Sequence, residues 1–184
     1  MPKTASPIKF TYQDYLLLSE DKRYEIIEGE LFMVPAPIPY HQDIFRSLFR
    51  VLTDYAQSKN LGKVYSAPID VVLSDENIVQ PDILFISKQR LSIITEKNIQ
   101  GAPDLVVEIL SPGTAEKDKI LKRKLYAKFG VKEFWLVDGK KKEIEVLSLQ
   151  EEDLKRWGVY TGEETLFSFL WQDIRIPVNE VFRV

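Results

Sequence analysis

Two acidic residues in apolar surroundings are the first candidates for chemistry in this sequence. Asp82 follows Pro81 within the β-branched segment 78–86, and Glu108 lies inside the apolar run 105–110. A charge in the middle of a buried strand is costly unless it is paired or bound to a metal. Neighbouring strands lie about 4.8 Å apart, so carboxylates at matching heights on two strands can bind one hard cation. We therefore predict that Asp82 and Glu108 hold Mg²⁺ or Mn²⁺, which prefer oxygen ligands.

The ordinary interpretation of a Pro-Asp pair competes with this hypothesis. Pro103-Asp104 is a second such pair, and it opens the segment that contains Glu108. Four residues of strand place the backbones of Asp104 and Glu108 roughly 13 Å apart, too far for one ion, so we expect Asp104 to be a strand-entry residue. On spacing alone Asp82 would be assigned to a common turn. The predicted burial of Glu108 is what favours a functional site.

The helix predicted over residues 114–129 supplies a candidate cation. At 3.6 residues per turn, Asp118, Lys122 and Tyr126 form one stripe. The stripe flanks an apolar face formed by Ile120, Leu121, Leu125 and Phe129. Lys124 competes with Lys122, because it falls inside the apolar arc of the helical wheel. For either lysine alone, the more common interpretation is a side chain that extends from the rim of a buried face into solvent.

The composition narrows the possible chemistry. The chain has 184 residues, no cysteine and a single histidine, His41. Disulfides, thiolate zinc sites, iron–sulfur clusters, cysteine nucleophiles and metal sites with two histidines are therefore excluded, and carboxylates must carry any metal chemistry. His41 begins a predicted helix, where capping or surface hydrogen bonding is the usual role and a metal or phosphate contact is less common.

The charge balance gives no overall attraction to nucleic acid. Lys and Arg number 25 against 28 Asp and Glu, for a net charge of −3. A nucleic acid would have to be met by a local patch, and the predicted helix carries the one such cluster, at Lys117, Lys119, Lys122, Arg123, Lys124 and Lys128. No apolar run approaches the ~20 residues of a membrane span, and residues 1–11 do not resemble a secretory signal. We expect a soluble, cytoplasmic protein without a membrane partner.

The elements that position these residues follow from the pattern of apolar and turn-forming residues. We predict a short capped helix over 11–18, two β segments in 24–34 around Glu28-Gly29, and an amphipathic helix over 40–58. Segments 64–73 and 78–86 are β-branched and should pair as antiparallel neighbours, and residues 88–100 form a loop with a helical turn. We predict a central strand over 104–110 and two strands over 132–138 and 143–149.

This order of elements predicts an α/β or α+β domain in which helices flank a mixed sheet. Gly130 lies where a left-handed cap would end the helix 114–129. The sequence has no internal repeat, low-complexity segment or linker, so we expect residues 1–184 to form a single domain.

Residues 24–147 resemble the Uma-two family of restriction-endonuclease-like proteins, within the PD-(D/E)XK nuclease superfamily. The order and spacing of several short motifs carry the resemblance: residues 24–30, His41, residues 79–84, residues 101–112, Asp118 with Lys122 and Tyr126, and residues 130–138. It implies a restriction-endonuclease-like fold, in which helices flank a mixed β-sheet. It also implies a metal-dependent endodeoxyribonuclease that acts on DNA with Mg²⁺ or Mn²⁺.

The resemblance also assigns roles to particular residues. Asp82 takes the position of the motif aspartate and Glu108 that of the second acid. If these two acids hold the metal ion, we expect the carbonyl of Ile109 to add a further ligand. The superfamily's lysine position is occupied by Leu110, whereas Lys122 matches the lysine that the family places in the following helix.

The resemblance leaves weaker candidates and rival functions open. Glu25 and His41 are secondary candidates, for an outer ligand shell or a phosphate contact. A homodimer is expected, because duplex cleavage needs two active sites. Leu110 and the acidic charge balance favour an alternative, a catalytically inactive DNA-binding or assembly module. A hydrolase of smaller phosphodiesters also stays open, since the sequence has no recognisable element for reading DNA sequence.

Overall fold

The structure is a computed structural model that describes residues 8–19, 21–111 and 118–183. Its largest layer is a six-stranded mixed sheet in the order β11-β10-β9-β8-β6-β3. The bounds of these strands are Gly62–Ser66 for β3, Ile83–Ser87 for β6, Leu105–Ile109 for β8, Glu133–Asp138 for β9, Glu143–Gln150 for β10 and Asp153–Thr161 for β11. β8 and β9 are parallel and the other neighbours are antiparallel.

A five-stranded sheet has the order β2-β1-β5-β4-β7, and β12 pairs with β13. The strands of the five-stranded sheet are β1 (Arg23–Ile27), β2 (Glu30–Val34), β4 (Val71–Ser74), β5 (Asn77–Val79) and β7 (Ile99–Gln100). The short pair is β12 (Thr165–Leu166) with β13 (Ile176–Pro177). The helical segments are α1 (Tyr12–Tyr15), α2 (Pro39–Ser58), η1 (Lys88–Ile93), η2 (Asp118–Lys122), α4 (Arg123–Lys128) and α5 (Val178–Val181).

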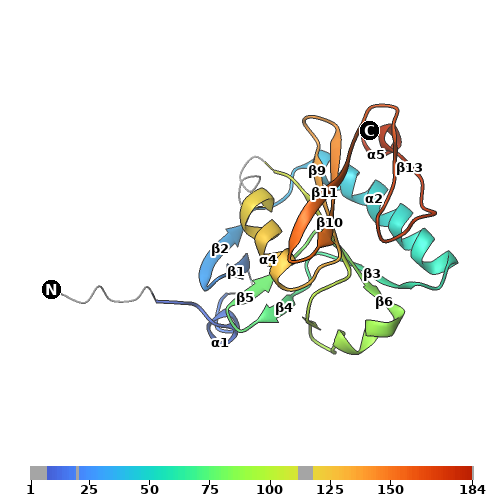
Figure 1. Ribbon diagram of the computed structural model, residues 1–184. Helices are drawn as coiled ribbons and strands as arrows, with labels where there is room; N and C mark the ends of the chain where they lie inside the picture. The colour runs from blue at the N-terminus through green and yellow to red at the C-terminus, as the bar shows by residue number, and fades with distance from the viewer. Residues whose placement is uncertain (1–7, 20, 112–117, 184) are drawn as a thin grey trace.

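Helices cover both faces of the six-stranded sheet, as the sequence predicts. Residues of α2 and of the C-terminal segment pack with Val107 and Ile109 of β8 in one apolar cluster. Residues of α4 and of the five-stranded sheet pack with Val106 in a second cluster on the opposite face. Figure 1 shows α4 and α2 on opposite sides of β9 and β10. All five residues of β8 are buried, which explains its continuous apolar sequence and confirms its central position.

The prediction that segments 64–73 and 78–86 are two continuous strands is wrong. Each segment breaks in the middle, so that β3 and β6 pair in the six-stranded sheet, while β4 and β5 pair in the five-stranded sheet. The predicted antiparallel pairing itself is confirmed. Pro68 and Pro81 lie at the breaks, where a residue without an amide hydrogen interrupts the ladder. Asp82 consequently lies directly before β6, where the chain passes from one sheet to the other.

The helix predicted over residues 114–129 also differs from expectation. Its part before residue 118 lies outside the described residues, and the part that is described begins with the π-helical turn η2 before α4. Ile120 and Leu121 are 48% and 36% exposed, so the predicted apolar face is wrong at these two positions. Lys122, Leu125 and Tyr126 are buried instead. A π turn has a wider repeat than 3.6 residues, which shifts the residues before α4 around the helix axis.

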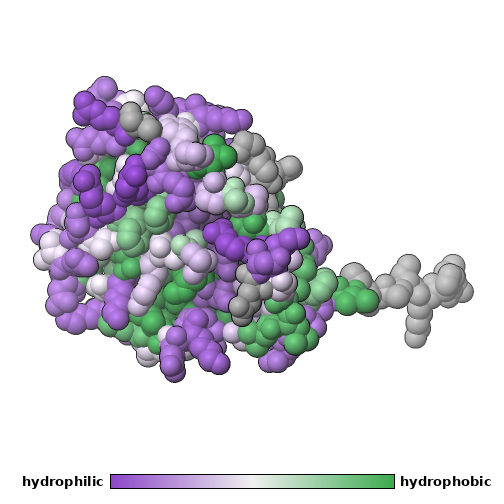
Figure 2. All heavy atoms as spheres, turned by 180° about the vertical axis from the view of Figure 1, so that it is seen from behind, coloured by the Kyte–Doolittle hydropathy of each residue, from purple (hydrophilic) through white to green (hydrophobic). Residues whose placement is uncertain are grey.

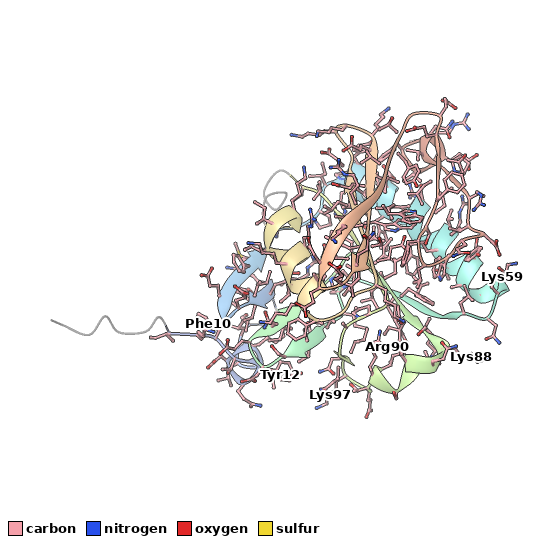
Figure 3. All side chains as sticks on the ribbon, viewed as in Figure 1. Phe10, Tyr12, Lys59, Lys88, Arg90 and Lys97 are labelled. Carbon is pink, nitrogen blue, oxygen red and sulfur yellow. The ribbon has the colours of Figure 1, made fainter. Side chains whose placement is uncertain are left out.

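Asp104 precedes β8 and anchors its start, in keeping with its expected role at strand entry. Its buried carboxylate accepts a hydrogen bond from the Ser87 amide at 2.8 Å and lies 2.7 Å from Lys132 Nζ. It also lies 3.1 Å from a guanidinium nitrogen of Arg90, a residue labelled on η1 in Figure 3. Burial raises the pKa of Asp104, but these hydrogen bonds and the Arg90 charge outweigh it and hold the pKa below its usual value.

Hydrophilic side chains cover most of the face seen in Figure 2, with hydrophobic patches between them. Ile8 and Leu17 are the most exposed large hydrophobic residues among those described, at 91% and 86%. None of the helices in the described ranges is long and apolar enough to cross a membrane.

Candidate active site

Most of the site residues predicted from the sequence line one pocket of about 90 Å³. Its wall includes Glu25, His41, Asp82, Glu108, Ile109 and Lys122. The pocket lies where β1, the first turn of α2, the end of β8 and the η2–α4 helix meet. Lys124 is not part of this wall. Lys124 is exposed and lines a separate surface hollow with Glu151 and Asp153. Of the two lysines, Lys122 is therefore the one that lines the pocket.

Lys122 joins the two sheets through its ammonium group. Its Nζ lies 2.8 Å from Oε1 of Glu25, on β1 of the five-stranded sheet. It also lies 2.8 Å from Oε1 of Glu108, on β8 of the six-stranded sheet. All three side chains are at most 5% exposed. In this environment the Lys122 ammonium offsets negative charge on two buried carboxylates, whose burial without a cation would be costly.

Tyr126 is a member of this cluster for which sequence reasoning proposed no role. Its hydroxyl donates a hydrogen bond of 2.7 Å to Glu108 Oε1, and its ring is fully buried. Burial, with the charge of Glu108, raises the pKa of Tyr126 well above its usual value, so the phenol stays protonated as a donor. The available signal was its spacing of four residues from Lys122, which places both side chains on one helical face.

Glu25 was only a secondary candidate, yet it lies as close to Lys122 as Glu108 does. Its Oε1 also accepts a hydrogen bond of 3.0 Å from the Gln80 amide. The Gln80 side chain in turn donates to Tyr15 at 3.1 Å and to Asp70 at 2.9 Å. This chain of contacts fixes the position of Glu25 from the side of the five-stranded sheet. The signal in the sequence was its place in the motif 24–30 that carries the family resemblance, which gave it a secondary role and no contact with Lys122.

Asp82 is oriented by the chain end of β8. Its Oδ2 accepts a hydrogen bond of 2.7 Å from the Ile109 amide, next to Glu108 in the chain. The same oxygen lies 3.3 Å from Nε2 of His41, in the first turn of α2. Asp82 and His41 are 16% and 11% exposed, so this side of the pocket is more open than the Lys122 side. Asp82 therefore reaches the pocket from the crossing between the sheets and not from within a strand.

The donor set suits a hard cation that keeps part of its water shell. Three carboxylates line the pocket with two cationic side chains, Arg23 and Lys122, which leaves an excess of negative charge. Among the described residues, no three histidine or acidic side chains lie close enough to hold a metal ion by themselves. Mg²⁺ commonly binds through one or two carboxylates and retains waters, so Asp82 with Glu108 matches its needs in kind and number. The side chain of Asp118 lies outside the description of the structure.

A mixed sheet with helices on both faces, and a cluster of carboxylates and one lysine at the end of its central strand β8, place the protein among those of restriction-endonuclease-like fold. The family model described as "Uma2: Putative restriction endonuclease" matches residues 11–178. The chain therefore belongs to the Uma2 family, as the resemblance noted in the sequence implies.

A solved structure supports the same fold. The chain is similar to the crystal structure, at 1.96 Å resolution, of a protein described as a "putative nuclease belonging to DUF820" from Anabaena variabilis ATCC 29413. The TM-score is 0.79 at 19% sequence identity, over 94% of this chain and 97% of that chain. At this identity the likeness shows the fold alone. A comparison with curated proteins found no match.

Proposed function

We propose that the protein is a metal-dependent endonuclease that hydrolyses phosphodiester bonds in DNA. The observation that carries this proposal is the position of the Lys122 ammonium, 2.8 Å from Glu108 and in the same pocket as Asp82. Carboxylates for a metal ion and a fixed cation for phosphate charge are what phosphodiester hydrolysis requires. The two core clusters include residues from Ile27 to Phe182, which supports the further proposal that the chain forms one domain.

Asp82 and Glu108 are the proposed ligands of Mg²⁺ or Mn²⁺, with the carbonyl of Ile109 as a third. When bound, such an ion polarises a phosphoryl oxygen and makes a bound water more acidic. The Ile109 amide holds Asp82 beside this position through its hydrogen bond of 2.7 Å. Tyr126 holds Glu108 in the same way from α4. These two contacts keep both carboxylates turned to the pocket, so little reorganisation is needed when substrate enters.

Lys122 is the proposed catalytic cation. A fixed ammonium orients the attacking water or offsets the extra negative charge of the transition state, and it acts more strongly in a pocket with little solvent. Glu25 is a positioning residue in this proposal, because it holds Lys122 from the side opposite to Glu108. Leu110 in the superfamily's lysine position is compatible with activity on this view, since the cation comes from the helix. His41 is proposed to contact a phosphate of the DNA next to Asp82.

A cleavage assay tests the proposal directly. Purified protein is incubated with supercoiled plasmid, linear duplex and single-stranded DNA, with Mg²⁺, Mn²⁺ or EDTA. We expect cleavage that depends on the metal ion and that falls about 10²-fold or more in Asp82→Asn, Glu108→Gln and Lys122→Met. Glu145→Gln is the matched control, because this strand carboxylate pairs with Arg156 at 2.7 Å and is not part of the pocket wall.

The same assay separates the proposal from its rival, a module that binds DNA without cutting it. Metal-dependent cleavage that survives both Asp82→Asn and Glu108→Gln would overturn the assignment of the site. If no cleavage occurs, and calorimetry detects no Mg²⁺ or Mn²⁺ binding that depends on Asp82 and Glu108, the rival holds. We also propose that the active form is a homodimer, since cutting both strands of a duplex takes two sites. Sedimentation of the protein on duplex DNA tests that proposal.

A further inference from the structure

A second cavity, of about 160 Å³, adjoins the pocket of the candidate active site. Its walls are mostly apolar and include Ile38, Tyr40, Ile44 and Leu110. The two cavities share His41, which lies in the wall of both. A ligand bound in the second cavity would therefore lie next to any phosphate that is held beside Asp82.

The size of this cavity fits one flat ring. An apolar cavity of about 150 Å³ binds a benzene-sized molecule. A volume of about 160 Å³ thus accommodates a six-membered ring and is small for a fused pair of rings. Gly139 forms part of the wall, and a β-carbon at this position would lie 2.8 Å from Ile44 Cδ1 and 3.1 Å from Tyr40 Cε1. This part of the cavity stays open because residue 139 is a glycine.

Two polar atoms beside the cavity lack partners. The Tyr40 hydroxyl and His41 Nδ1 are buried, and neither has a hydrogen-bond partner among the residues that the structure describes. A buried donor or acceptor without a partner costs free energy, and a ligand with polar ring atoms recovers it once the neighbouring side chains move to admit the ligand. A nucleobase offers a flat apolar face together with such edge groups, whereas a purely aliphatic ligand offers neither.

The surroundings of the cavity also suit a nucleotide backbone. The 20-residue helix α2 begins here, with Ile38 as its N-cap and no side chain capping its amides. The N-terminus of a long helix is favourable for phosphate, through its amide groups and its dipole. Lys140 and Asp138 both line the cavity, so their opposite charges offset each other and the helix N-terminus is the feature that favours a phosphate.

We propose that this cavity binds the pyrimidine base of the nucleotide next to the scissile phosphate. This inference rests on the proposed nuclease function and narrows its substrate to DNA with an unpaired pyrimidine. A base in the cavity has left the helical stack, so single-stranded, frayed or distorted DNA is bound more readily than an intact duplex. Ring size sets the preference, because a purine adds a second ring to a cavity of this volume.

Binding of labelled octadeoxynucleotides, measured by fluorescence anisotropy with Ca²⁺ in place of Mg²⁺, tests the inference. We expect oligothymidylate to bind about tenfold more tightly than oligodeoxyadenylate or an octamer of abasic nucleotides. Gly139→Ala narrows the cavity at the flexible end of Ile44 and should lower the affinity for oligothymidylate to that for the abasic octamer. Tyr40→Phe should weaken oligothymidylate binding about fivefold without lowering thermal stability, because its hydroxyl has no partner within the described chain. Tyr160→Phe is the control, since that hydroxyl bonds Phe167 and lies outside both cavities.

Equal affinity of the wild type for the three octamers would overturn the inference, as would a Gly139→Ala variant that weakens binding of all three equally. The cleavage assay separates this result from failure of the proposed function. Metal-dependent cleavage without base preference leaves the nuclease assignment in place and removes the pyrimidine site. Pyrimidine-dependent binding without any cleavage supports the pyrimidine site and removes the nuclease assignment.

Discussion

Removing the Lys122 ammonium is the sharpest test of how the site is held together. Lys122→Met keeps a long, unbranched side chain but leaves Glu25 and Glu108 without the cation that lies 2.8 Å from each. Loss of one partner from a buried ion pair costs about 3–5 kcal/mol, because the remaining charge stays buried. Here two carboxylates lose the same partner, so we expect a loss of stability in at least that range.

Thermal unfolding followed by circular dichroism measures this loss. For a protein of this length, 1 kcal/mol corresponds to a change of about 2–4 °C in Tm, so Lys122→Met should unfold roughly 6–20 °C lower than the wild type. Lys124→Met is the matched control, since Lys124 lies two residues further along, is exposed, and should change the free energy of unfolding by less than about 0.5 kcal/mol.

A second substitution separates the electrostatic cause from a packing defect. Adding Glu25→Gln to Lys122→Met removes one of the two buried charges that lost the Lys122 ammonium and should restore part of the lost stability, whereas a packing defect would persist. The reasoning is refuted if Lys122→Met and Lys124→Met unfold within about 2 °C of each other. It is equally refuted if the double variant is no more stable than Lys122→Met.

Three further predictions concern one contact of the site and two contacts that hold the six-stranded sheet. Tyr126→Phe removes a buried hydrogen bond of 2.7 Å to a carboxylate and should lower the free energy of unfolding in urea by about 1.5–3 kcal/mol. Because ion pairing with Lys132 helps to hold the pKa of Asp104 below its unfolded value, Asp104 stabilises the fold above the unfolded pKa and loses this effect as the pH falls through the folded pKa. The stability of the wild type should therefore fall more steeply than that of Asp104→Asn between neutral pH and about pH 3, and equal slopes in urea titrations would contradict this. Gly62→Ala places a β-carbon 2.1 Å from the main-chain oxygen of Ile86 and should cost about 3 kcal/mol, measured as a lower urea midpoint at unchanged m-value.

The sequence predicts the elements of this fold better than it predicts their breaks. The central position of β8 follows from its uninterrupted apolar residues, and the two-strand hairpin follows from Glu28-Gly29, both of which adopt positive φ. The sequence shows less clearly that the segments 64–73 and 78–86 each pass from one sheet to the other. Each half of these segments has the residue pattern of a strand and pairs as a strand. Pro68 and Pro81 mark the breaks, but a single proline in a strand-like segment is also compatible with an edge strand.

The candidate site could be predicted in part for a similar reason. The conflict between the charge of Glu108 and its apolar neighbours is visible in the sequence, and the structure places that side chain in a buried network. Helical periodicity places Tyr126 on the face of Lys122, but the contacts of Glu25 with Lys122 and of Tyr126 with Glu108 join residues distant in the chain, which periodicity does not reveal. Lys122, Leu125 and Tyr126 share a buried face at the ordinary α-helical spacing, whereas the exposure of Ile120 and Leu121 follows the π turn, which a wheel of 3.6 residues per turn does not contain.

The ion pairs of Lys122 tie the assembly of the pocket to the completion of folding. The three charged groups are Glu25 on β1, Glu108 on β8 and Lys122 on the helix that follows β8. No fragment shorter than residues 25–122 contains all three. Contacts across such separations form only when the intervening chain has been ordered. A chain that is incompletely folded, or still being synthesised, would thus contain these residues without the contacts between them. Any hydrolysis of DNA would begin only once the chain has folded completely.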